Sequence, residues 1–220
     1  MTTGADSGFA ELEQALCRGR HARSGERETA AAAAARLSAR IATEGLADIA
    51  YAPVDSPFGT LLAAATGKGL VRLAFPEEDI DTTLEGLARR ISPRIVEAPA
   101  SLERVRRELD EYFAGARRAF ELPQDWTLMS AFAHKVLRAT YEIPYGGVSS
   151  YAEVAAEAGS PRGSRAAGNA LGSNPIPIVV PCHRVLRSGG NLGGYGGGLE
   201  RKRWLLELEG ALPKRETGSR

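Results

Sequence analysis

The 220-residue sequence predicts an α/β protein of the α+β type, in which a small N-terminal β-sheet and helix domain precedes a mainly helical C-terminal domain with a helix-turn-helix. Two apolar runs joined by tight turns predict the sheet. Two short helical segments across a glycine-containing turn predict the helix-turn-helix. We therefore expect an N-terminal extension over 1–48, an α/β domain over 49–123, a C-terminal domain over 124–212 and a tail over 213–220.

Composition excludes several classes of protein. No apolar run approaches the ~18 residues that a membrane span needs, so we expect no membrane partner. The first residues lack the basic and apolar segments of a secretory signal. The chain has two cysteines, Cys17 and Cys182, which excludes a disulfide scaffold and favours a reducing, cytoplasmic location.

The N-terminal part begins with a segment unlike the rest. Residues 1–48 are rich in Ala, Arg and Glu, and helix formers dominate 30–42, which predicts one or two amphipathic helices or a partly disordered arm. From Ile49 onward, two apolar runs with turns at 55–57 and 67–69 predict a small antiparallel β unit.

Helical spacing then marks three segments. It predicts helices over 79–90 and 101–115, the second from a repeat of apolar residues. That repeat consists of Leu102, Val105, Leu109 and Phe113. After a loop containing Pro123, Met129 to Leu137 predict a helix that ends before Pro144.

The helix-turn-helix candidate follows. Ser150 and Glu153 form a capping box that starts a short helix over 151–158, which ends at Gly159. A second helix begins after Pro161 and has an unusual face of small residues, flanked by two arginines. These residues are Arg162, Arg165, Ala166, Ala167 and Gly168. Small residues permit close approach to another surface, although they also permit tight helix packing.

Positive charge concentrates in the same region. Between 161 and 203 there are seven basic residues and one acidic residue, in a chain whose net charge is +1. A local basic segment on an otherwise acidic protein suggests contact with a polyanion. A solvated basic face is the alternative.

The segment 174–185 is the most informative. Three prolines and an apolar run predict an extended, rigid and buried approach to the Cys182–His183 pair. A neighbouring imidazole can make a cysteine nucleophilic by stabilising its thiolate, but adjacent residues cooperate only if the backbone turns between them. The glycine-rich segment 188–198 that follows lacks a phosphate-loop motif and could wrap closely over a flat ligand. An amphipathic helix over 199–208 comes next.

The motifs of this half, in order and spacing, resemble the O6-alkylguanine-DNA alkyltransferases, also called methylated-DNA–protein-cysteine methyltransferases. They are IPYGGVSSY at 143–151, RAAGNA at 165–170, NPIP at 174–177, PCHRV at 181–185, GYGGGL at 194–199 and KRWLL at 202–206. The strong match covers 128–210, 49–123 looks like the family's N-terminal domain, and 1–48 resemble nothing that we can name. The resemblance implies that 124–212 form a DNA-binding and alkyltransferase domain.

The resemblance also implies a catalytic set. Cys182 is the alkyl acceptor, and His183 is the base that acts through a bound water. Glu209, on the last helix before Gly210, orients this histidine, while Asn174 holds the turn before the cysteine.

Further residues are implied to bind the substrate. Tyr151 donates to the base ring, and backbone N–H groups around Val185 and from Tyr195 to Gly196 contact the purine edge. Gly196 stands where many relatives have serine, so a hydroxyl contact to O6 is lost. Lys202 is placed near the pocket, unless it is a solvent-exposed helix lysine.

In the family the protein enters the minor groove of double-stranded DNA and flips the target base. Arg165 resembles the intercalating finger, with a phosphate contact as the alternative role. Arg162, Arg184 and the small residues Ala166, Ala167 and Gly168 are expected at the DNA surface.

The implied activity is a single irreversible transfer per molecule, by a monomer without a cofactor or metal. Action on O4-alkylthymine as well stays open. Cys17 and His21, at helical spacing, supply only half of a tetrahedral zinc set.

Two other functions compete. An alkyltransferase-like protein would bind the lesion without transfer, but it would lack the acceptor cysteine. A Cys-His hydrolase for small substrates would leave the basic helix-turn-helix segment unexplained.

Overall fold

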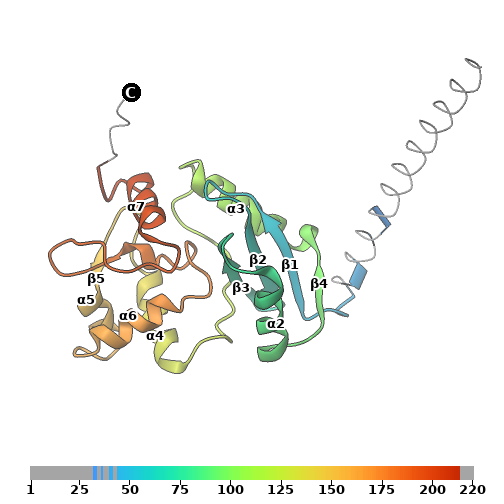
Figure 1. Cartoon of the computed structure of the whole chain (residues 1–220), viewed down its shortest axis with the longest axis horizontal. Coiled ribbons are helices and arrows are strands. Elements are labelled where there is room, and N and C mark those ends of the chain that lie inside the picture. Colours follow the sequence, from blue (N-terminus) through green and yellow to red (C-terminus); the bar gives the residue numbers. More distant parts are fainter. Residues whose placement is uncertain (1–31, 34–35, 37–39, 42–43, 214–220) are drawn as a thin grey trace, which may run out of the picture.

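The computed structural model describes residues 32–33, 36, 40–41 and 44–213. Most of the expected extension, including Cys17 and His21, and the tail from residue 214 lie outside this part of the chain. In Figure 1 the β-sheet and its two helices lie on the right of the view, and a group of four helices lies on the left. In the described ranges, every helix is too short or too polar to span a bilayer.

The N-terminal part is built on a four-stranded sheet in the order β3-β2-β1-β4. The strands are β1 (Ile49–Val54), β2 (Leu61–Thr66), β3 (Gly69–Ala74) and β4 (Ile95–Glu97). The first three pair antiparallel, which confirms the predicted β unit and its turns. The short β4 pairs parallel to β1 and was not predicted from the sequence, because three residues carry too little pattern.

Two helices accompany this sheet, as predicted. Helix α2 (Ile80–Arg90) begins after Asp79, whose side chain accepts from the backbone N–H of Thr82. Helix α3 (Glu103–Phe113) follows a 3₁₀ turn, η1 (Pro99–Leu102). The prediction placed Leu102 inside the helix, whereas it ends the 3₁₀ turn that begins at Pro99 and leads into α3.

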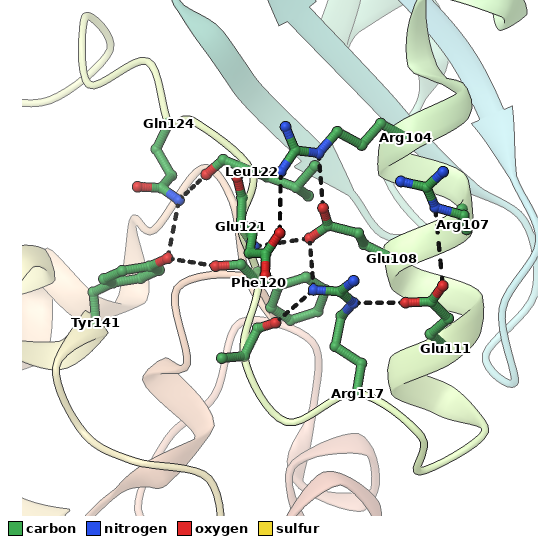
Figure 2. A network of polar contacts seen from close by, with 11 residues as sticks. Arg104, Arg107, Glu108, Glu111, Arg117, Phe120, Glu121, Leu122, Gln124 and Tyr141 are labelled. Atoms are coloured by element: carbon green, nitrogen blue, oxygen red, sulfur yellow. Dashed lines mark hydrogen bonds and ion pairs between the residues drawn. The ribbon is translucent and has the colours of Figure 1, made fainter.

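The segment between the two halves is fastened to α3 and to the helix that follows (Figure 2). Glu108 of α3 is buried; its carboxylate accepts from Nε of Arg104 at 2.9 Å and from the backbone N–H of Glu121 at 2.8 Å. From the other side, the hydroxyl of Tyr141 donates to the carbonyl of Phe120 at 2.9 Å. The linker is therefore held at several points rather than left free.

The C-terminal part contains four helices, two of which form the helix-turn-helix. The elements are α4 (Ala131–Tyr141), β5 (Ser149–Ser150), α5 (Tyr151–Glu157), α6 (Ser164–Gly172), η2 (Cys182–Arg184), β6 (Val185–Leu186) and α7 (Leu199–Leu208). The capping box of Ser150 and Glu153 forms at the start of α5, as predicted. Met129 lies outside α4, because Ser130 caps the helix by accepting from Ala133.

One apolar core joins the two halves. Its buried members come from the sheet, from α3 and from every helix of the C-terminal part, so the halves share an interior. Residues of α3 and Cys182 are members of this same core.

Candidate active site

The backbone turns at the cysteine, which was the condition for Cys182 and His183 to cooperate. Both residues lie in the 3₁₀ turn η2, and Cys182 is 6% exposed. Consecutive side chains of a 3₁₀ turn are rotated by about a third of a turn from each other, whereas those of a strand point to opposite faces. The condition that the backbone turns between them is therefore met.

The approach to the cysteine is a tight turn rather than the extended segment predicted. The backbone N–H of Val180 donates to the carbonyl of Ile176, and Ile178 adopts a positive φ of 73°. Such a conformation is unusual for a β-branched residue and is tolerated where the surroundings impose it.

Asn174 imposes this turn. Its Nδ2 donates to the carbonyl of Val180 at 2.9 Å and to Sγ of Cys182 at 3.1 Å, while its Oδ1 accepts from the N–H of Ile176 at 3.1 Å. The role expected for Asn174 fits these three contacts.

His183 is wholly buried and faces Glu209, the residue that caps α7. Its Nε2 lies 3.0 Å from Oε1 of Glu209. Burial lowers the pKa of His183, although Glu209 acts in the opposite direction, so the imidazole is neutral at pH 7. A carboxylate accepts hydrogen bonds, so Nε2 carries the proton. Nδ1 has no partner among the described residues and remains able to take a proton.

Glu209 receives more donors than the sequence predicted. Arg184 contacts both of its oxygens, with Nε and Nη2 each at 2.8 Å, and the hydroxyl of Tyr112 lies 2.6 Å from Oε1. Burial alone would raise the pKa of Glu209, but the hydrogen bonds from His183 and Arg184, together with the positive charge of Arg184, outweigh it and lower the pKa to about 2. The carboxylate is therefore an anion throughout the physiological range.

The cysteine itself is a thiol at rest. Burial raises the pKa of Cys182 to about 11, despite the hydrogen bond from Asn174 and the positive charge of Lys202, which both lower it. Thiolate chemistry at this sulfur requires a base that takes the proton during the reaction.

Two cavities meet at Cys182. The larger has a volume of about 810 Å³ and lies against the helix-turn-helix. Its lining includes Tyr151, Arg165, Gly168, Cys182, Tyr195 and Gly196. The smaller, of about 400 Å³, extends towards the N-terminal part, where Phe75 and Arg72 line it. No pattern in the sequence indicated that N-terminal residues reach the cysteine's surroundings.

A buried lysine binds the glycine-rich segment 188–198, part of which lines the larger cavity. Nζ of Lys202 donates to the carbonyls of Val185 at 2.6 Å, of Gly194 at 3.2 Å and of Leu192. Lys202 is fully buried, which excludes the solvent-exposed alternative. Burial lowers its pKa to about 8, so Lys202 is still a cation at pH 7.

Gly197 shows why this segment needs glycine. A Cβ built there would lie 2.6 Å from Cε2 of Phe75 and 2.8 Å from Cε1 of Tyr195. Any side chain would have to displace these two rings. The segment therefore packs closely between them.

Three predicted contacts do not fit their positions. Arg184 is buried, and its guanidinium binds Glu209 and the carbonyl of Ile143, so it is not at a DNA surface. Ala167 is also buried and packs in the core. The N–H of Val185 already donates to the carbonyl of Cys182, so it is not free for a purine.

The basic segment is accordingly less exposed than its composition predicts. Arg184 and Lys202 are interior groups, and Arg201 forms an ion pair with Glu77. Arg162, Arg165 and Arg187 remain exposed. The carboxylates that pair with Arg184 and Arg201 lie 25 and 124 positions away in the sequence.

The helix-turn-helix presents the remaining residues beside the larger cavity. Arg165 and Ala166 are exposed near the start of α6, and Gly168 lies beside the ring of Tyr151, whose Cδ1 would be 3.6 Å from a Cβ added to this glycine. The hydroxyl of Tyr151 donates to the carbonyl of Gly194 at 3.3 Å. In the part of the chain that the structure describes, no group of three or more His, Cys, Asp or Glu side chains could hold a metal ion.

Fold and site together define an α/β protein in which a helix-turn-helix lies over a buried cysteine that is backed by a histidine and a glutamate. Two family models match the chain. They are 6-O-methylguanine DNA methyltransferase, ribonuclease-like domain, over residues 49–126, and 6-O-methylguanine DNA methyltransferase, DNA binding domain, over residues 131–211. The chain belongs to the 6-O-methylguanine DNA methyltransferase family.

Individual relatives agree with this assignment. A methylated-DNA–protein-cysteine methyltransferase of Mycolicibacterium paratuberculosis is 41% identical over 161 residues, which cover 73% of this chain and 92% of that protein. A constitutive methylated-DNA–protein-cysteine methyltransferase of Bacillus subtilis is 38% identical over 72% of this chain and 94% of its own length.

Two crystal structures from Mycobacterium tuberculosis share the fold. One is an O6-methylguanine methyltransferase, with a TM-score of 0.65, 38% identity and coverage of 74% of this chain and 93% of that one. The other is an alkyltransferase in complex with DNA, with a TM-score of 0.64, 39% identity and the same coverage.

Proposed function

We propose that this protein repairs alkylated DNA by transferring the alkyl group from O6 of guanine to Sγ of Cys182. The observation that carries the proposal is the buried sulfur at the meeting point of two cavities, beside a neutral histidine held by an ionised glutamate. Family membership supplies the DNA and the lesion as substrate.

The proton of the thiol must leave as the sulfur attacks, because the resting pKa of Cys182 is about 11. Nδ1 of His183 takes this proton through a water, and Glu209 stabilises the imidazolium that results. The S–C bond forms as the C–O6 bond breaks, and the bonding pair of C–O6 stays with the purine. One proton returns to the purine, so that the products are S-alkylcysteine and guanine.

A stacked base cannot reach a sulfur at the bottom of a cavity, so the target nucleotide is flipped out of the duplex. Arg165 fills the space that the base leaves, and Ala166 lets α6 approach the minor groove closely. Arg162 contacts phosphate from the same edge of the helix-turn-helix. Gly168 gives the base room beside Tyr151.

Donors around the larger cavity favour departure of the guanine. Tyr151 exchanges its contact with the carbonyl of Gly194 for one with the base ring, and the backbone N–H groups of Tyr195 and Gly196 face the purine edge. Each transfer consumes the protein, because the thioether formed on Cys182 has no route back to a thiol. We further propose that a monomer acts once, in the cytoplasm, and that O4-alkylthymine is a second substrate because the cavity admits a pyrimidine.

The test is incubation of the full chain with duplex DNA that carries O6-methylguanine labelled in its methyl group. We expect one label per protein, mapped to Cys182 by peptide analysis, and no label on Cys182→Ser despite retained DNA binding. Label on Cys17, or repeated turnover without labelled protein, would exclude the proposed reaction. A matched duplex with labelled O4-methylthymine tests the second substrate, and absence of label would remove it.

A further inference from the structure

A tyrosine of the N-terminal part reaches into the site. Tyr112 of α3 is fully buried, and its hydroxyl donates to Oε1 of Glu209 at 2.6 Å, across 97 positions of sequence. The same oxygen lies 3.0 Å from Nε2 of His183. Tyr112 thus touches the atom that holds the histidine.

The position of this hydroxyl is fixed from several sides. One turn before Tyr112, on the same face of α3, the buried Glu108 binds the linker and sets the helix in place (Figure 2). The ring of Tyr112 packs against Phe120 with centroids 5.1 Å apart and against Tyr145 at 6.2 Å. Burial, together with the charge of Glu209, raises the pKa of Tyr112 far above its usual value, so the hydroxyl stays a donor.

We propose that Tyr112 is a positioning residue for the transfer reaction, which holds Oε1 of Glu209 where it fixes His183 as the tautomer protonated on Nε2. This inference rests on the proposed function. It makes the N-terminal part a member of the catalytic arrangement, since the other hydrogen-bond donors to Glu209 come from residues 146–184.

The hydroxyl also tunes the histidine. A donor on Oε1 weakens that oxygen as an acceptor for the N–H of His183, so it disfavours the imidazolium. Besides Glu209, two cations face His183, Arg184 and Lys202, and their charges also lower its pKa. The remaining titratable neighbours are Tyr195, whose ring lies beside the imidazole, and Cys182. Removing the hydroxyl therefore makes His183 more basic.

The experiment measures single-turnover transfer from O6-methylguanine duplex DNA as a function of pH, using the full chain. Tyr112→Phe keeps the ring and removes the hydroxyl. We expect transfer at neutral pH to slow by about tenfold, the equivalent of one hydrogen bond to a charged group. The acid limb of the pH–rate profile should move to higher pH by about half a unit, because His183 must be neutral to accept the proton and becomes more basic in this variant.

The matched control is Tyr141→Phe. Its hydroxyl also crosses between the halves and donates to the carbonyl of Phe120 (Figure 2). It is not among the donors to Glu209. We expect its rate and pH profile to match those of the unmodified protein.

A second substitution covers the case in which Tyr112→Phe folds poorly. Site-specific 3-fluorotyrosine at position 112 keeps the shape and donates more strongly, so the acid limb should move downward. Unshifted limbs in both Tyr112 proteins, or equal rate losses at every pH, would overturn the positioning role. If the unmodified protein itself transfers no label, the proposed function fails and this inference fails with it.

Discussion

Replacement of Glu209 by glutamine should destabilise the protein strongly, because the carboxylate is the counter-charge of a buried arginine. Both oxygens of Glu209 contact the guanidinium of Arg184, which is 6% exposed. Glutamine keeps the shape, but it removes the charge and turns an –NH₂ group towards one of these donors. Arg184 would then be a buried cation without a balancing anion.

Two estimates of the magnitude agree. Breaking a buried ion pair from one side costs about 3–5 kcal/mol in the free energy of unfolding. The pKa of Glu209, lowered from 4.5 to about 2, corresponds to about 3 kcal/mol of preference for the ionised carboxylate in the folded state. We therefore expect Glu209→Gln to lose about 3 kcal/mol at pH 7.

The pH dependence has a definite sign. The folded-state pKa of Glu209 lies below its unfolded value, so its contribution is complete above about pH 4.5 and disappears as the pH falls to about 2. The difference in stability between the unmodified protein and Glu209→Gln should therefore shrink over this interval.

Urea unfolding followed by tryptophan fluorescence measures both effects. The control is Glu85→Gln, because Glu85 is 71% exposed and pairs only loosely with Arg89, at 3.5 Å. This variant should change stability by less than about 0.5 kcal/mol. A loss below about 1 kcal/mol for Glu209→Gln, or curves that stay parallel from pH 7 to about pH 2, would refute the reasoning.

Three further predictions concern the reaction and its product. Arg165→Ala should slow repair of duplex DNA by more than about tenfold while leaving attack on free O6-benzylguanine nearly unchanged, since only the duplex must be opened; equal losses on both substrates would argue for a folding defect. Lys202→Met should release the segment 187–198, detected as faster proteolysis there, whereas exposed Lys135→Met should not. Methylation of Cys182 should lower the melting temperature by about 2–4 °C, because an added methyl group costs about 1 kcal/mol even beside a cavity; an unchanged melting temperature after stoichiometric reaction would show that the pocket has room to spare.

Local chemistry made much of the fold predictable. The capping box of Ser150 and Glu153 and the turns at 55–57 and 67–69 lie where the sequence placed them, because each depends on neighbours within a few residues. The resemblance of the motifs likewise named Glu209 and Asn174, which contact His183 and Cys182 in the structure, while their roles in the reaction stay predictions.

Features that depend on distant partners were missed or misjudged. Arg184 was expected at the DNA surface because composition counts charges without their counter-charges, and Glu209 lies 25 positions away. For the same reason, the sequence does not decide whether Lys202 lies in the pocket or in solvent. Nothing in the sequence around Tyr112 indicated a functional role beyond its place in an amphipathic helix, because its partner Glu209 is 97 positions away.

The charges around the sulfur explain how one site can be inert at rest and reactive once. With neutral His183, the buried ionisable groups near the sulfur are the cations Arg184 and Lys202, the anion Glu209 and the thiol of Cys182 itself. Their sum is one positive charge, and transfer of the thiol proton to the buried His183 leaves that sum unchanged, while the charge of Lys202 lowers the pKa of Cys182. Burial nevertheless keeps that pKa near 11, which protects the resting thiol from oxidation because the thiolate is the reactive form. Alkylation leaves the sulfur uncharged, as it is at rest, so charge does not distinguish product from resting protein. Any effect of alkylation on stability or on DNA release must therefore come from the added atoms pressing on the turn that Asn174 holds.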